Sequence, residues 1–448
     1  MASVTAWLDA IGAVVWGPPM LALLVGTHVF LTVRLRFVQR HLWRGIKLSV
    51  ARAPEGRGDV SQFGALTTSL AACLGTGNIV GVATAIAAGG PGALLWMWLT
   101  GVFGIATKYG EALLAVKYRV VAADGTIAGG PMYVLERGMG RRGLALAFAL
   151  FTAVSAFGIG NTVQANSIAT LAHDTLGVSV WVTGVLLAAL TAAVILGGVR
   201  AIAAVCERLV PLMAALYVAG CLIVLARHAG EVPGALALIL RSAVTGEAAF
   251  GGFVGAGMRE AVRYGIARGL FSNEAGLGSG SIIAAAAQTR NPVRQALVAS
   301  TAVFWDTVVV CALTGLALVA SGVWAEEGHS GATMAAAAFA HVPVVGPVIL
   351  TVALLTFVFS TLLGWSYFGE KACEYIFGSG VVRAYRWLWV AAVLVGAVLP
   401  IPVVWSASDI TNALMALPNL LSLLVLSGVI VSETRRYLWS DDLDAEGS

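Results

Sequence analysis

The chain has 448 residues, of which 59% are hydrophobic and only 11% are charged, and its formal net charge is +4. Charged residues make up about a quarter of a typical soluble domain, so this composition excludes a soluble globular protein and predicts a chain that lies in lipid. The modest net charge also argues against a nucleic-acid-binding surface.

Apolar runs long enough to cross a bilayer recur along the whole chain. They predict eleven spans, near residues 11–33, 64–88, 92–116, 145–171, 178–198, 209–226, 251–288, 296–320, 345–368, 387–403 and 410–431.

Lys and Arg concentrate in alternate loops, which predicts the orientation of the chain. Loops 34–60 and 117–143 are rich in both, whereas 172–177 has neither, and only 227–250 departs from the alternation. We therefore expect a multi-pass protein of the cell (plasma) membrane, with its N-terminus outside and its C-terminus in the cytoplasm.

The second span is interrupted at its centre by Gly75-Thr76-Gly77-Asn78. Glycine is a poor helix residue, and unwound backbone survives at membrane depth only where protein or a watery cavity satisfies it. Taken alone, the stretch also fits close helix packing by small residues.

The seventh span is interrupted too, by "RGLFSNEAGLGSGS" at residues 268–281. It lies five spans after the first break, so the two broken helices run in opposite directions, as in inverted repeats. We expect an extra N-terminal helix and basic loop (1–60), a first five-helix repeat (61–230), a second, inverted repeat (231–435) and an acidic tail (436–448). The predicted fold is thus all-α, with five plus five helices and one extra.

A broken helix exposes two kinds of backbone end. The free N–H groups at a half-helix N-terminus suit a carboxylate, and the free carbonyls at a half-helix C-terminus suit an ammonium group or a hard cation such as Na⁺. A site with both ends is matched to a zwitterion. Gly75, Gly77 and Gly276 are the best candidates for close backbone approach.

Polar side chains in other spans extend this candidate site. Gln164 lies with Asn161 and Asn166 in the fourth span, where interhelical hydrogen bonds are the alternative interpretation. Ser360 and Thr361 end the ninth span as possible oxygen ligands, although such hydroxyls also bond back to their own helix. Trp365, four residues later, could instead be an interfacial aromatic.

Glu274 is the only acid beside a central break. It could face a substrate ammonium, take part in proton coupling, or lock the broken helix through backbone N–H groups. We interpret Asp306 and the Lys108/Glu111 pair as structural ion pairs or network members. The sequence has no metal-ligating His cluster, no P-loop and no GxSxG or HExxH motif, so we expect neither an enzyme nor an ATP-driven pump.

Several stretches resemble the sodium:alanine/glycine symporters. They include "GGPGALLWMWLTGVFGIATKYGEALLAVKYR" (89–119), with Leu95 where the family usually has Phe, and "GGPMYVLERGMG", "NTVQANSIA", "RGLFSNEAGLGS", "LGWSYFGEK" and "ALPNLLSLLVLSG" in the expected order. The resemblance implies a leucine-transporter-type fold of eleven helices and import of a small neutral amino acid with Na⁺.

The resemblance also implies the site residues. For the amino acid they are Thr76, Gly77, Asn78, Gln164, Phe271, Ser272, Asn273, Glu274, Thr361 and Trp365. For Na⁺ they are the carbonyls of Ala71 and Leu74 and the hydroxyls of Ser360 and Thr361, in a register that follows from aligning G-x-G-N.

Other functions remain open at this level. A channel or receptor-like sensor could use the same bundle, although a channel needs a continuous polar pathway and here the polar residues concentrate at the midplane. Within transport, the alternative is a proton-coupled or broader-specificity amino-acid transporter. The expected partners are a small amino acid, Na⁺ (with H⁺ as the other possible coupling ion) and lipid.

Overall fold

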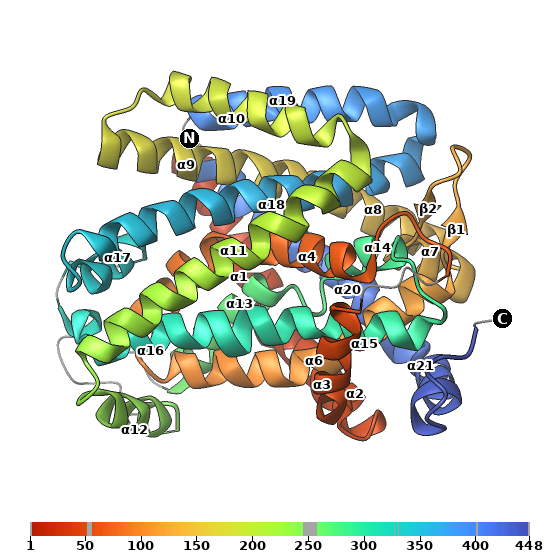
Figure 1. Ribbon diagram of the computed structural model, residues 1–448, viewed down its shortest axis with the longest axis horizontal. Helices are drawn as coiled ribbons and strands as arrows, with labels where there is room; N and C mark the ends of the chain where they lie inside the picture. Colours follow the sequence, from red (N-terminus) through yellow and green to blue (C-terminus); the bar gives the residue numbers. More distant parts are fainter. Residues whose placement is uncertain are drawn as a thin grey trace.

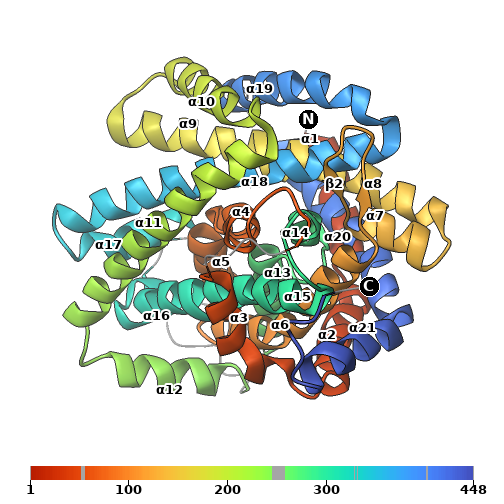
Figure 2. The ribbon, with the colours of Figure 1, turned by 45° about the vertical axis from the view of Figure 1, so that its right-hand side comes forward.

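The computed structural model describes residues 2–51, 56–244, 258–326, 328–329, 331–399 and 402–446. These residues form a bundle of helices with one two-stranded hairpin (Figure 1). Figure 2 shows the halves of the two broken helices at the centre, with longer helices around them.

The N-terminal third contains six helices and corrects one predicted boundary. They are α1 (Ala2–Val15), α2 (Pro18–Arg34), α3 (Leu42–Ser49), α4 (Gln62–Cys73), α5 (Val82–Gly89) and α6 (Ala93–Lys117). The span predicted at 11–33 is two helices, because Pro18 occupies the first position of α2, where the missing N–H and fixed φ of proline favour a new helix start.

The middle third carries the hairpin and the longest helical hairpins. Its elements are β1 (Val120–Val121), β2 (Ile127–Ala128), α7 (Pro131–Tyr133), α8 (Arg142–Phe157), α9 (Val163–Leu176), α10 (Val180–Ile195), α11 (Gly198–Arg227) and α12 (Val232–Ser242). A π-helical turn at Gly158–Thr162 joins α8 to α9. Helix α12 lies in a segment that we predicted to be a loop.

The C-terminal part contains α13 (Met258–Asn273), α14 (Ser279–Ala285), α15 (Pro292–Val303), α16 (Ala312–Ala320), α17 (Ala332–Ala340), α18 (Val345–Phe377), α19 (Val382–Val398), α20 (Pro402–Val425) and α21 (Ser427–Thr434). The first residues of the span predicted at 251–288 lie outside the described residues. Helix α15 continues into α16 through a π-helical segment, Phe304–Cys311.

Long apolar helices account for much of the described chain. Six of them are long and apolar enough to cross a membrane, or up to eight if each of two bent pairs is counted as one span. The 25-residue α6 carries Lys108 and Glu111 at its centre. The chain is therefore a multi-pass helical protein, and the full count of eleven spans stays a prediction.

Both expected helix breaks are present. Helices α4 and Gly77–Gly89, which includes α5, meet at a bend of 54°. Helices α13 and α14 are separated by residues 274–278, where Glu274, Gly276 and Gly278 have positive φ. Such angles favour glycine, so two of the glycines that marked this break in the sequence occupy positions that require them.

The connections separate to two ends of the bundle. In Figure 1 the β1–β2 hairpin, the α10–α11 turn, the start of α19 and the C-terminus lie to the right, whereas the α9–α10 turn, α12 and α17 lie to the left. The loops predicted to be cytoplasmic thus share one end, which we call the inner end. Its cytoplasmic orientation remains a prediction.

Candidate functional site

The two helix breaks contact each other at the centre of the bundle. The Asn78 amide nitrogen donates a hydrogen bond to Ser272 Oγ over 3.0 Å, and Cys73 Sγ lies 3.7 Å from the carbonyl oxygen of Asn273. Asn78 Oδ1 accepts a 3.0 Å hydrogen bond from the Gly75 N–H. An asparagine from one broken helix therefore stabilises its own break and joins it to the other.

A small cavity lies between the breaks. Among the predicted substrate residues it is lined by Thr76, Gly77, Gln164, Phe271, Glu274, Thr361 and Trp365. It leaves only about 20 Å³ for the centres of water-sized molecules, which is roughly room for one water. Even the smallest amino acid is larger, so the lining must move to admit a ligand.

Asn78, Ser272 and Asn273 do not line this cavity. Asn78 and Ser272 instead bind the carboxylate of Asp306, with oxygen distances of 2.6 and 2.8 Å, and Thr307 donates to the same carboxylate over 2.7 Å. The structure therefore gives these two predicted ligands a supporting role behind the backbone of the breaks. It confirms the interpretation of Asp306 as a network member.

Asn273 also bonds locally, since its Oδ1 accepts from the Ala275 N–H over 2.9 Å. Its amide nitrogen is buried and has no hydrogen-bond partner among the described residues. The side chain therefore shapes the second break and keeps one donor in reserve.

Acidic side chains hold the second break open. Glu274 accepts a 2.5 Å hydrogen bond from Ser279 across the unwound residues, and Glu111 accepts from the Gly276 N–H over 2.7 Å and from Asn419 over 2.8 Å. The Lys108 ammonium lies 3.5 Å from the Glu274 carbonyl oxygen. Of the roles considered for Glu274, these contacts favour locking the helix, although its partner is a hydroxyl and Glu111 takes the backbone N–H.

Five oxygens gather beside the cavity, where α4 meets α18. Ser360 Oγ lies 3.2 Å from the Ala71 carbonyl oxygen, 3.5 Å from that of Leu74 and 2.8 Å from that of Phe357. Thr361 Oγ1 lies 3.3 Å from the Leu74 carbonyl and 3.0 Å from the Phe357 carbonyl. The predicted Na⁺ ligands thus lie together, and Phe357 adds an oxygen that the sequence did not reveal.

This oxygen cluster suits a hard monovalent cation. Carbonyl and hydroxyl oxygens are ligands for hard cations, and no cluster of three His, Cys, Asp or Glu side chains occurs within the described ranges to favour a transition metal. The hydroxyl protons now point at carbonyls and would turn away from a bound cation. Gly75 permits the close approach, because a Cβ there would lie 2.7 Å from Thr361 Oγ1.

Two amide oxygens remain open at the cavity wall. Gln164 donates to the Ile159 carbonyl over 2.9 Å, while its Oε1 is buried without a partner in the described part of the chain. The same holds for Oδ1 of Asn412 on α20, which also lines the cavity. Asn412 was missed; its signal was an amide in an apolar span.

Asn161 and Asn166 belong to a different interface. Asn161 donates to the Trp389 carbonyl over 3.0 Å, and Asn166 donates to the Gly396 and Leu399 carbonyls over 3.2 and 3.1 Å. Both tie α9 and its π turn to α19, so the interhelical alternative holds for them. Gln164 alone of the three lines the cavity.

The arrangement can hold a small zwitterion beside a cation. Glu274 is the only acidic side chain in the cavity lining, which has no basic side chain. A ligand carboxylate would therefore depend on the Thr76 and Gly77 N–H groups, which begin the second half-helix and are left without intrahelical partners. The open amide oxygens and Glu274 suit an ammonium group.

Comparison with known proteins gives a consistent result. Residues 1–446 match the family described as Sodium:alanine symporter family. The chain is 48% identical over 440 residues to the Sodium/alanine symporter AgcS of Methanococcus maripaludis, covering 96% of each chain. It is 49% identical over 434 residues to an uncharacterized transporter of Haemophilus influenzae, covering 96% of this chain and 95% of that protein.

A solved structure shows the same fold. MhsT in complex with L-phenylalanine superposes with a TM-score of 0.57 at 16% sequence identity, covering 88% of this chain and 94% of that chain. The leucine-transporter-type architecture that the resemblance implied is thus observed in this bundle.

Proposed function

Because the chain belongs to the sodium:alanine symporter family, we propose that it imports alanine or glycine together with Na⁺ by alternating access around the central cavity. The observation that carries this proposal is the contact between the two helix breaks, with the five-oxygen cluster directly beside them and Thr361 belonging to both.

The cavity lining supports recognition of the amino-acid backbone. The carboxylate binds at the Thr76 and Gly77 N–H groups, and the ammonium group faces Gln164 Oε1, Asn412 Oδ1 and the Glu274 carboxylate. Asn273, which we expected to contact the ammonium, lies behind the second break. Backbone recognition of this kind is common to all amino acids, so selectivity rests on volume.

Volume is limited by two aromatic side chains. Phe271 packs beside Gly77, and Trp365 packs against Gly160, where an added Cβ would lie 2.4 Å from the Trp365 Cβ. Trp365 is 3% exposed, so the indole occupies a fixed position. Both rings close the space where a long substrate side chain would extend, which supports alanine or glycine over larger amino acids.

Na⁺ couples to the substrate through shared backbone. The ion binds the carbonyls of Ala71, Leu74 and Phe357 with the hydroxyls of Ser360 and Thr361, and Leu74 is two residues before Thr76. Ordering this backbone positions the N–H groups that receive the carboxylate. Each ligand then raises the affinity of the other.

Alternating access would move one helix group against another around the fixed site. We keep residues 61–230 and 231–435 as the two inverted repeats, because their broken helices run in opposite directions and meet at the centre. Residues 1–60 remain the added N-terminal segment and 436–448 the acidic tail.

The deciding experiment is uptake of labelled alanine by proteoliposomes that contain the purified protein. An inward Na⁺ gradient should drive accumulation, and dissipating it with a Na⁺ ionophore should abolish accumulation. Uptake that ignores Na⁺ but follows an imposed pH gradient would contradict Na⁺ coupling and favour the proton-coupled alternative. A current without a fixed ratio of ion to substrate would favour a channel.

A further inference from the structure

A second polar cavity lies at the inner end of the bundle. It has a volume of about 230 Å³ and is lined by the segment before α4, the β1–β2 hairpin, the α10–α11 turn, the end of α18 and the start of α19. These segments come from both halves of the chain and from loops that the charge pattern predicts to be cytoplasmic. This inner cavity is much larger than the central one.

Helix α18 joins the two cavities. Thr361 and Trp365 line the central cavity, and Tyr367, Glu370 and Lys371 line the inner cavity. Lys371 follows Thr361 by ten residues, or about 15 Å along the helix axis. A molecule that leaves the central cavity along α18 toward the inner end therefore reaches the inner cavity next.

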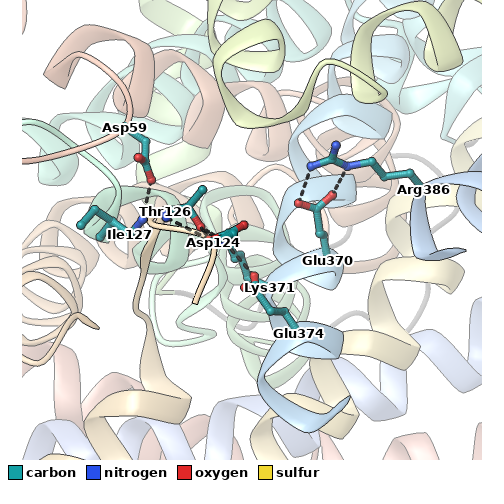
Figure 3. Close-up of polar contacts among 8 residues, drawn as sticks. All are labelled: Asp59, Asp124, Thr126, Ile127, Glu370, Lys371, Glu374 and Arg386. Atoms are coloured by element: carbon teal, nitrogen blue, oxygen red, sulfur yellow. Dashed lines mark hydrogen bonds and ion pairs between the residues drawn. The ribbon is translucent and has the colours of Figure 1, made fainter. Parts of the chain in front are cut away.

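The inner cavity carries both signs of charge in buried positions (Figure 3). The Lys371 ammonium lies 2.8 Å from Glu374 and donates to Thr126 in the hairpin over 3.1 Å. Arg386 forms a two-pronged contact with Glu370, at 2.7 and 2.9 Å. The cavity is thus lined by ion pairs, one of which reaches across to the first half of the chain.

Two further carboxylates come from the first half of the chain. Asp59 accepts a 2.7 Å hydrogen bond from the Ile127 N–H in the hairpin. Burial opposes the charge of Asp124, but hydrogen bonds from the Thr126 hydroxyl and N–H, together with Lys371, outweigh it and lower the pKa of Asp124. The hairpin side of the cavity therefore stays negative at neutral pH.

Tyr367 is the unexplained group of this cavity. It lines the wall and is 1% exposed, yet its hydroxyl has no hydrogen-bond partner among the described residues. The Lys371 ammonium, one helical turn later, lies 5.8 Å from the centre of the Tyr367 ring. A buried hydroxyl without a partner is costly, which points to a ligand that satisfies it.

Building on the proposed function, we propose that the inner cavity is an exit station that transiently binds the zwitterionic amino acid on its way from the central cavity to the cytoplasm. Tyr367 and Lys371 bind the carboxylate, and Asp59 and Asp124 face the ammonium group.

Charge balance makes such a station reversible. A zwitterion carries both members of an ion pair, so it can replace Glu374 at Lys371 while its ammonium group meets the hairpin carboxylates. The exchange leaves no buried charge without a partner, which would be strongly unfavourable. Because the displaced Glu374 competes for Lys371, binding stays weak enough for release.

The test uses right-side-out membrane vesicles, in which the inner end faces the lumen if the predicted orientation holds. Exchange of external labelled alanine is measured against increasing internal alanine. The substitution Tyr367→Phe should raise the internal concentration for half-maximal exchange by about three- to tenfold, the range for one lost hydrogen bond, and leave the external half-saturation concentration unchanged. The double substitution Lys371→Gln with Glu374→Gln should act in the same direction.

Tyr385→Phe is the matched control, because Tyr385 is also a buried tyrosine whose hydroxyl has no partner within the described residues, and it does not line the cavity. An internal constant that is equal for the wild type and Tyr367→Phe overturns the exit station, as does an equal rise on both sides. A wild-type protein without any Na⁺-dependent alanine exchange contradicts the proposed function itself.

Discussion

Thr361 connects the amino-acid site and the ion site at the scale of a single residue. Its side chain lines the central cavity, and its hydroxyl lies 3.3 Å from the Leu74 carbonyl in the oxygen cluster. A residue in both sites should affect both ligands. Ser360, next to it, belongs to the oxygen cluster alone, so the pair can separate ion binding from substrate binding.

The substitution Thr361→Ala should raise the Na⁺ concentration for half-maximal alanine uptake by about three- to tenfold, because one oxygen ligand is lost. Uptake by proteoliposomes at varied Na⁺ measures this. Thr356→Ala is the control, since Thr356 lies on the same helix and bonds only to its own helix carbonyls. An unchanged Na⁺ dependence in Thr361→Ala would remove this residue from the ion site.

Trp365→Ala should admit larger amino acids. The indole is buried against Gly160 at the cavity wall, and its removal opens space that an apolar side chain can fill. Competition by leucine with labelled alanine uptake measures the change, with Trp387→Ala, an exposed tryptophan, as the control. If only glycine and alanine still compete, Trp365 does not limit substrate volume.

At the scale of the element, each broken helix is held by side chains from its neighbours. The first break is held by Asn78 and, through it, by Asp306. The second is held by Glu274 and by Glu111 on α6. Unwound backbone in lipid must find partners inside the protein, and these buried polar side chains supply them.

Removing Glu111 should therefore destabilise the whole bundle. In Glu111→Ala the Gly276 N–H and Asn419 lose their acceptor, and the buried Lys108 loses a nearby negative charge. We expect a loss of about 3 kcal/mol in the free energy of unfolding, measured as a lower thermal midpoint in detergent. Asp441→Ala, which breaks an exposed ion pair with Arg44, should cost less than about 1 kcal/mol.

At the scale of the whole molecule, ion and substrate binding are coupled through the meeting of α4, α13 and α18. If Na⁺ raises the affinity for alanine by some factor, alanine must raise the affinity for Na⁺ by the same factor. Equilibrium binding of each ligand to the purified protein, with and without the other, tests this. Two independent affinities would show that the five-oxygen cluster does not order the substrate backbone.

The predicted orientation is testable in intact cells. Asp174 lies at the end opposite the inner end, and Asp441 lies near the C-terminus; their side chains are 66% and 76% exposed. We expect Asp174→Cys to react with a membrane-impermeant maleimide in intact cells and Asp441→Cys to react only after permeabilisation. The reverse pattern would invert the topology. The cysteine-bearing wild type is the control, because four of its five cysteines are buried.

The central breaks could be predicted because glycine, Ser, Asn and Glu are conspicuous in apolar spans, and lipid leaves such residues few alternatives. Resemblance then supplied the predicted ion ligands at Ala71, Leu74, Ser360 and Thr361, which the structure places together. Helix ends were less predictable: α12 and the interruption before Pro18 depend on local geometry that an apolar run does not specify.

By itself, the sequence determined that this chain spans lipid, that two of its helices are broken and that a small polar site lies at the breaks, because composition and spacing are properties of the chain alone. Only the tertiary structure decided which way each side chain points. It turned Asn78 and Ser272 toward Asp306, brought Asn412 and the Phe357 carbonyl to the site and left Tyr367 without a partner. Such contacts join residues far apart in the chain, and packing alone brings them together.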